Sequence, residues 1–200
     1  MELVLETAPE NEPISTSELA LHLRLDDYES VYEHDIELKS IIKAATIHVE
    51  NITSRKLITQ TWNYYFDAFP DEKYIKIPFG NLQSVSSVKY TDSDGDETTM
   101  TVSDDYIVEI NGDQCGRIVL PYSTSWPSFT AYPSNPIKVQ FICGWTSKNN
   151  LPDQYKSVIK LICSDLYENR EGQVLSNKDY RKNNTVMNLL NSSILRDSFL

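Results

Sequence analysis

At residues 54–66 the chain reads Ser-Arg-Lys-Leu-Ile-Thr-Gln-Thr-Trp-Asn-Tyr-Tyr-Phe, and here its pattern changes from helical to strand-like. Before this stretch, apolar residues recur every three or four positions, as they do on one face of a helix. Within it, Trp62, Tyr64 and Phe66 share one face, and the residues between them take the other. This period of two is typical of a half-buried strand. The alternation continues for about eighty residues, until a second helical pattern begins near Pro152. The sequence therefore predicts helices, then an inserted β region, and then helices again.

Two long helices flank the predicted β region. The first runs from Asp35 to Thr53, and the second runs for about 28 Å from Pro152, a residue that suits the first turn of a helix. Each carries one continuous apolar stripe that has to be buried, so we expect the two helices to pack on each other. The stripes consist of Leu38, Ile41, Ile42, Ala45, Val49 and Ile52 in the first helix, and of Tyr155, Val158, Ile159, Ile162 and Leu166 in the second.

A shorter helix is predicted to begin after Ser15. The residues Ser-Thr-Ser-Glu at 15–18 have the spacing of a capping box, in which Ser15 and Glu18 satisfy each other's backbone N–H groups. Residues 1–14 are expected to be extended, because Pro9 and Pro13 disfavour a helix. Residues 26–34 are expected to form a polar, acidic loop.

The predicted strands of the β region are connected without any helix long enough for a parallel crossover, so they should pair antiparallel. Asp94-Gly95 is a hairpin turn signal. The segment Pro121–Pro136 contains four prolines and is predicted to be a long loop. The strands are expected at Trp62–Asp67, Lys73–Ile77, Ser84–Thr91, Glu97–Val102, Tyr106–Ile110, Arg117–Leu120 and Ile137–Cys143.

These elements predict an α+β fold with a small helical core and an inserted antiparallel β region. We expect an N-terminal helical part at 1–56, the β region at 57–146, the long helix that completes the core at 147–172, and a C-terminal arm at 173–200. The arm has an amphipathic piece without an obvious place in the two-helix core. It is predicted to dock on another subunit or partner, the alternative being a frayed terminus.

Charge and composition exclude several classes of protein. The 200 residues include 29 acidic and 18 basic side chains, giving a net charge of −11. Residues 1–35 alone contain ten acidic residues and only Arg24 as a base. A clamp on nucleic-acid phosphates requires clusters of Lys and Arg, so such a clamp is not expected. No apolar run is long enough to predict a transmembrane helix, and residues 1–9 lack the features of a signal peptide.

No catalytic residue, metal site or cofactor site is predicted. The acids Asp92, Asp94, Asp96 and Glu97 surround Gly95, but a calcium loop needs glycine at its sixth position and glutamate at its twelfth. We interpret this segment as a hairpin tip with solvated acids. No P-loop, dinucleotide or His-Glu-x-x-His motif is present. The cysteines, Cys115, Cys143 and Cys163, are odd in number and widely spaced, which predicts free thiols in a reducing compartment.

Aromatic residues indicate an interaction surface. The chain has twelve tyrosines and three tryptophans, and aromatics among small polar residues are typical of interfaces. Within the long loop, Trp126, Phe129 and Tyr132 are the candidate interface residues. Burial of these rings in the sheet core is the alternative, and it stays open.

A series of short segments occurs in a telling order along the chain. The segments are Ser-Thr-Ser-Glu-Leu-Ala-Leu-His-Leu-Arg-Leu-Asp at 15–26, Thr-Ser-Arg-Lys-Leu-Ile-Thr-Gln-Thr-Trp at 53–62, Ile-Pro-Phe-Gly-Asn-Leu-Gln-Ser-Val at 77–85, Ser-Trp-Pro at 125–127, Cys-Gly-Trp at 143–145, Leu-Pro at 151–152 and Tyr-Glu-Asn-Arg-Glu at 167–171. Taken in order, they resemble the head–tail connector proteins of long-tailed bacteriophages and gene transfer agents, also called adaptor or head-completion proteins. The resemblance covers roughly residues 3–171.

This resemblance implies a non-enzymatic virion protein, made in the bacterial host cytoplasm, that forms a ring, typically twelve-fold, under the portal protein. Tail or neck proteins would bind its other side, and double-stranded DNA would pass through without sequence-specific binding. No cofactor or membrane is implied.

The resemblance also suggests roles for particular residues. In such proteins the C-terminal region tends to engage the portal, although this chain has Leu-Leu-Asn-Ser-Ser at 189–193 where the family often has a Leu-Leu-x-Pro-Tyr-Arg-like segment. An acidic channel would repel DNA and let it slide. The alternative function is a protein- or carbohydrate-binding module that uses the loop around Trp126. The portal-docking candidates are Val186, Leu189, Leu190, Ile194 and Arg196, and the channel-lining candidates are Asp26, Asp27, Glu29, Asp92, Asp94 and Asp96.

Overall fold

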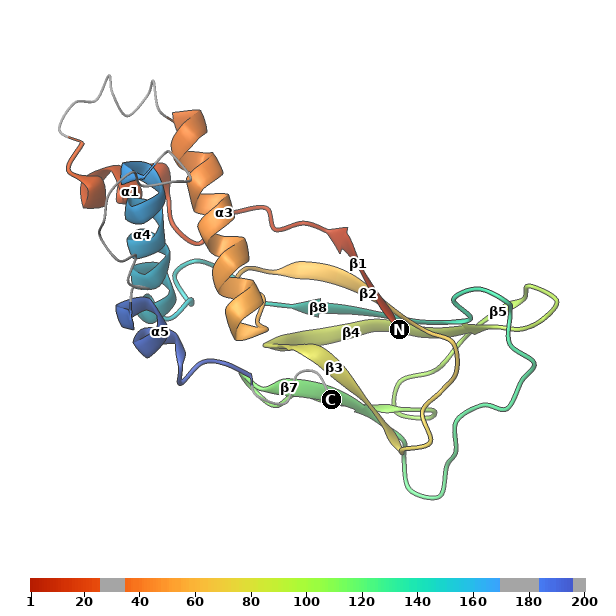
Figure 1. Cartoon of the computed structure of the whole chain (residues 1–200). Helices are drawn as coiled ribbons and strands as arrows, with labels where there is room; N and C mark the ends of the chain where they lie inside the picture. The colour runs from red at the N-terminus through yellow and green to blue at the C-terminus, as the bar shows by residue number, and fades with distance from the viewer. Residues whose placement is uncertain (26–34, 170–183, 196–200) are drawn as a thin grey trace. The chain divides into compact units, whose positions relative to one another are not determined.

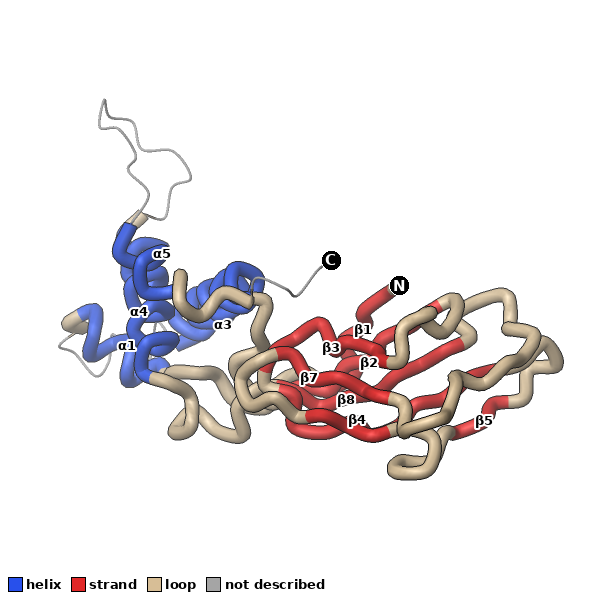
Figure 2. The backbone as a smooth tube through the Cα atoms, turned by 90° about the horizontal axis from the view of Figure 1, so that it is seen from below, coloured by secondary structure: helices blue, strands red, loops and turns tan. Residues whose placement is uncertain are grey.

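A computed structural model describes residues 1–25, 35–169 and 184–195, and its contacts divide the chain into two compact units (Figure 1). The β unit consists of Met1–Glu10 and Thr59–Trp145, together with Leu195. The helical unit consists of Asn11–Ile58 and Thr146–Ile194. Figure 2 shows the strands in the first unit and the helices in the second. The first ten residues therefore belong with the strands, whereas the sequence pattern had grouped them with the N-terminal helices.

The helical unit begins with the predicted capping box. The Ser15 hydroxyl accepts a hydrogen bond from the Glu18 N–H at 3.1 Å, and the Glu18 carboxylate accepts one from the Ser15 N–H at 2.7 Å. These bonds hold the Glu18 pKa below its usual value, mainly through the Ser15 backbone N–H. The helix ends at Arg24, which adopts a left-handed conformation. The described helices are α1 (Thr16–Leu23), α3 (Asp35–Thr53), α4 (Asp153–Glu168) and α5 (Asn184–Leu190).

Helices α3 and α4 pack on each other, as their apolar stripes predict (Figure 1). The α4 stripe differs from the prediction at its C-terminal end. At that end Cys163 is fully buried and Leu166 is 41% exposed. Cys163 lies one helical turn after the buried Ile159, so the buried face of the helix continues through Cys163 and not through Leu166. Pro152 is the N-cap of α4 and lies just before the first turn rather than within it.

Helix α5 has a place in the helical unit, which corrects the expectation that this segment has none. It contacts α4, and its side chains Val186 and Leu190 are buried. The Gln154 side-chain amide donates a hydrogen bond to the Leu189 carbonyl, and the Arg55 Nε–H donates one to the Ser193 carbonyl at 2.8 Å. These polar contacts come from residues far away in sequence, so helical periodicity could not reveal them.

The β unit contains two antiparallel sheets rather than a single one. The antiparallel pairing is as predicted. The chain changes sheets between β3 and β4 at Asn81, which adopts a left-handed conformation with φ of 57°. The five-stranded sheet has the order β1 (Glu2–Thr7), β2 (Gln60–Phe66), β8 (Ile137–Cys143), β4 (Leu82–Thr91) and β5 (Glu97–Thr99); the three-stranded sheet has the order β3 (Tyr74–Gly80), β7 (Cys115–Val119) and β6 (Ile107–Glu109).

One core joins the two sheets. Alternate residues of β8 are buried, as the sequence alternation predicts, and they cluster with residues of β3 and β7. Asn63 lies on the face of β2 opposite to this core, yet it is only 2% exposed. Its amide donates to the Glu6 carboxylate at 2.7 Å and accepts from Gln140 at 3.2 Å, so β1 is tied to β2 and β8 by side chains as well as by its backbone.

The cysteines are free thiols, as predicted. Burial raises the pKa of the Cys163 thiol to about 12, which keeps it protonated and unreactive at neutral pH. None of the helices within the described residues is long and apolar enough to cross a membrane.

Candidate interaction surfaces

The acidic hairpin between β4 and β5 is organised by one of its own carboxylates. Asp92 accepts hydrogen bonds from the Asp94 and Asp96 backbone N–H groups, both at 3.0 Å. Gly95 has a φ of 90°, a conformation that glycine adopts without strain. Asp92 therefore shapes the turn, while Asp94 and Asp96 are exposed at the tip. Within the described residues, no group of three or more His, Cys, Asp and Glu side chains could hold a metal ion. The other channel-lining candidates, Asp26, Asp27 and Glu29, lie outside the described residues.

The three candidate interface residues in the long loop after β7 differ in how far they are buried. The Trp126 ring stacks on Phe69, with centroids 4.9 Å apart and planes 2° from parallel. Phe129 contacts Phe69 and Tyr90, at centroid distances of 6.1 and 4.7 Å. Both residues are half-buried and pack against the core of the β unit, whereas Tyr132 is 44% exposed.

Helix α5 carries most of the portal-docking candidates. Val186 and Leu190 point into the helical unit and are buried, and Leu189 and Ile194 are half-buried. The most exposed apolar side chain of the helix is Met187, which is 38% exposed and which the sequence did not single out. Arg196 lies outside the described residues.

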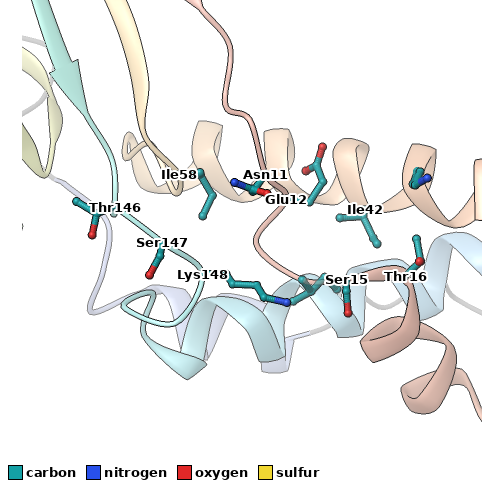
Figure 3. A pocket seen from close by; sticks show the side chains of 11 residues that line it. Asn11, Glu12, Ser15, Thr16, Ile42, Ile58, Thr146, Ser147 and Lys148 are labelled. Carbon is teal, nitrogen blue, oxygen red and sulfur yellow. The ribbon is translucent and has the colours of Figure 1, made fainter.

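A pocket of about 440 Å³ opens within the helical unit (Figure 3). Ile42 and Ile58 supply apolar lining, and Lys148 extends along the pocket toward Ser15. The Lys148 ammonium lies 3.5 Å from the Glu18 carboxylate, so this charge already has a partner. The pocket was not predicted, because its lining comes from α3 and from loops more than a hundred residues apart.

Glu12 is the carboxylate that lines this pocket. Burial raises its pKa above the usual 4.5, the Lys43 ammonium opposes that shift, and Glu50 adds to it. A raised carboxyl pKa means that the folded state disfavours the charged form. The charged Glu12 carboxylate therefore lowers the stability of the folded state. This loss of stability is fully present above the pKa that Glu12 has in the folded state. It disappears as the pH falls below 4.5, where the carboxyl is protonated in both the folded and the unfolded state.

Replacing Glu12 by glutamine is therefore expected to raise the midpoint of thermal unfolding at pH 7. The gain should shrink as the pH falls and should vanish below pH 4.5, because both proteins then carry a neutral side chain. Thermal unfolding followed by circular dichroism from pH 7 to pH 4 measures this difference. A gain that did not change with pH would show that the Glu12 charge is not its cause.

Comparisons with known proteins give a likeness at the level of structure. No family model and no curated protein matches the sequence. A solved structure described as the neck of an empty GTA particle, computed with C6 symmetry, contains a chain that matches with a TM-score of 0.81 and 20% identity. A virion of a native gene transfer agent (GTA) particle matches at 0.77 and 20%, and a neck of a native GTA particle, computed with C12 symmetry, at 0.74 and 18%. Each match covers 97% of this chain and 95% of the other, so the fold is shared over nearly the whole length.

Proposed function

We propose that the chain is a structural virion protein, a head–tail connector or adaptor that forms a ring between the portal protein and the tail or neck proteins. The observation that carries the proposal is the fold shared with a chain in a GTA neck, at a TM-score of 0.81 over 97% of this chain. The order of short sequence segments that resemble connector proteins supports the same role independently. The role requires binding surfaces and no bond chemistry or cofactor.

In the proposed assembly, identical subunits close into a ring through a head-to-tail interface, in which one surface of each subunit binds a different surface of the next. The neighbouring structures were computed with C6 and C12 symmetry, which supports a ring, and we propose twelve copies for this chain. The portal would bind at the C-terminal region. Since Val186 and Leu190 are buried, they would hold α5 in place, and Met187 would be available for contact.

Double-stranded DNA would pass through the ring in the assembled particle. The net charge of −11 per chain disfavours adhesion of DNA to the channel wall. We propose that the tip of the β4–β5 hairpin faces the channel.

Reversing the two exposed charges of this tip, with Asp94→Lys and Asp96→Lys together, is expected to slow DNA release from particles by roughly tenfold or more. Asp92 is left in place because it holds the turn. The neutral pair D94N and D96N should have a smaller effect of the same sign. DNA release can be timed with a dye that fluoresces on free DNA. Release at the normal rate from particles with both lysines would place the tip away from the DNA.

Assembly with the portal protein tests the proposed function. The purified chain is mixed with portal rings from the same particle, and mass photometry measures the mass that each portal ring gains. The expected gain corresponds to about twelve chains per portal ring. No gain at micromolar concentrations, with both proteins folded, would contradict the connector role.

A further inference from the structure

A second pocket, of about 340 Å³, lies in the β unit and has no role in the function proposed above. One wall comes from the turn between β5 and β6, with Asp104 and Asp105. The other comes from the loop after β7, with Ser125, Trp126 and Ser128. Buried Met100 also lines the pocket. The acids and the tryptophan are about twenty residues apart in sequence, so no local motif predicts their meeting.

Trp126 is fixed in position at this pocket. Phe69 stacks on the ring, and the indole N–H donates a hydrogen bond to the Glu72 carbonyl at 2.8 Å. Phe69 does not line the pocket, whereas Trp126 does. Trp126 therefore contributes to the wall of the pocket while its ring is held in place by Phe69 and the Glu72 carbonyl.

Both walls of the pocket are held by local hydrogen bonds. The Asp105 N–H donates to the Thr101 carbonyl at 2.9 Å, and the Thr101 N–H donates to the Asp105 carboxylate at 2.6 Å. In the opposite loop, the Thr124 hydroxyl donates to the Pro121 carbonyl at 2.8 Å. A pocket whose walls are already ordered loses less conformational entropy when a ligand binds.

The charges of the pocket select the class of ligand. Asp104 and Asp105 are exposed carboxylates, and none of the lining residues is a lysine or an arginine. One carboxylate accepts up to about four hydrogen bonds, so Asp105 can bind a further donor besides Thr101. An aromatic surface beside carboxylates attracts a cation by cation–π and charge interactions together. A guanidinium suits this arrangement better than an ammonium, because it is planar, stacks on indole and can bind a carboxylate with two hydrogen bonds.

We propose that this pocket binds an arginine side chain of a partner protein, between the indole of Trp126 and the carboxylates of Asp104 and Asp105. The complementary charge of the pocket identifies the partner surface as basic. The proposal does not rest on the connector role, since any partner with an accessible arginine satisfies it.

The test uses the full chain and N-acetyl-arginine amide as the probe. The indole N–H signal of Trp126 in a ¹⁵N-labelled sample, assigned with the W126F variant, reports binding. We expect this signal to shift with a dissociation constant in the millimolar range, as suits a single side chain. The N-acetyl-citrulline amide, which has the same shape without the charge, should produce no shift, and the lysine amide should bind more weakly.

Matched variants separate the pocket from general charge effects. D104N with D105N should weaken arginine binding by roughly fivefold or more. D94N with D96N, which changes the charge of the β unit equally at the hairpin tip, should leave it unchanged. Equal binding of citrulline, equal or tighter binding of lysine, or no effect of D104N with D105N would overturn the proposal. A shift with methyl glucoside and none with arginine would instead identify a carbohydrate site, and the absence of any shift would also overturn it.

Discussion

Replacing Glu50 by glutamine is expected to destabilise the helical unit by about 3–5 kcal/mol. Glu50 lies near the end of α3 and is 6% exposed. Its carboxylate accepts hydrogen bonds from the Lys56 ammonium at 3.1 Å and from the Leu57 N–H at 2.9 Å. Glutamine retains an oxygen for the Leu57 N–H but removes the negative charge that the buried Lys56 ammonium contacts. Removal of one partner of a buried ion pair costs far more than removal of an exposed one.

The double variant E50Q with K56M distinguishes this cause from a general loss of packing. It removes both charges, so most of the stability should return. K56M alone should be strongly destabilising, whereas K39M, the same change at a lysine whose side chain is 64% exposed, should have little effect. If E50Q and the double variant unfolded at the same urea concentration, the ion pair would not be the source of the loss.

Two spectroscopic signals report on the two units separately. The described helices belong to the helical unit, so circular dichroism at 222 nm follows that unit. Trp62, Trp126 and Trp145 all belong to the β unit, so tryptophan fluorescence follows the other. The E50Q loss should therefore appear first in the circular dichroism.

Replacing Phe141 by alanine is expected to cost about 3–5 kcal/mol in the β unit. Phe141 is fully buried on β8, where it pairs with Trp62 of β2 and Val85 of β4. Its ring centroid lies 6.3 Å from that of Phe79, on the facing sheet. Truncation therefore leaves a cavity between the two sheets, and the surrounding residues can relax only partly.

Urea unfolding followed by tryptophan fluorescence measures the effect of F141A. Y122A is the matched control, because it also truncates an aromatic ring in the β unit but at a residue that is 98% exposed. Y122A should unfold close to the unmodified chain. An F141A protein as stable as Y122A would contradict the assignment of Phe141 to the shared core.

The sequence predicts best where one local pattern decides the structure. The helix Asp35–Thr53 has the predicted bounds because its apolar stripe is uninterrupted, and α1 begins directly after Ser15 because the capping box is a local signal. Likewise, every second residue of β8 is buried, as the alternation in its sequence predicts. In each case the partner surface merely has to cover a face that the sequence already defines.

Prediction fails where contacts join distant segments. The burial of α5 depends on α4 and on hydrogen bonds from Gln154 and Arg55, and the division into two sheets depends on a turn at Asn81. The pocket proposed to bind arginine is formed by the turn between β5 and β6 and by the long loop after β7, and neither segment by itself predicts the other's position. Trp126 was identified as an interface candidate from its aromatic ring, but Asp104 and Asp105 were not, because acidic residues are common throughout this chain.

Electron cryomicroscopy of the portal complex, reconstructed first without imposed symmetry, is the most direct measurement of the proposed connector role. We expect copies of this chain to form a closed ring on one face of the portal, around an axial opening wide enough for duplex DNA and with the β4–β5 hairpin tip bordering it. Density for scattered single copies, or a ring that closes the axis with no passage, would contradict the connector role.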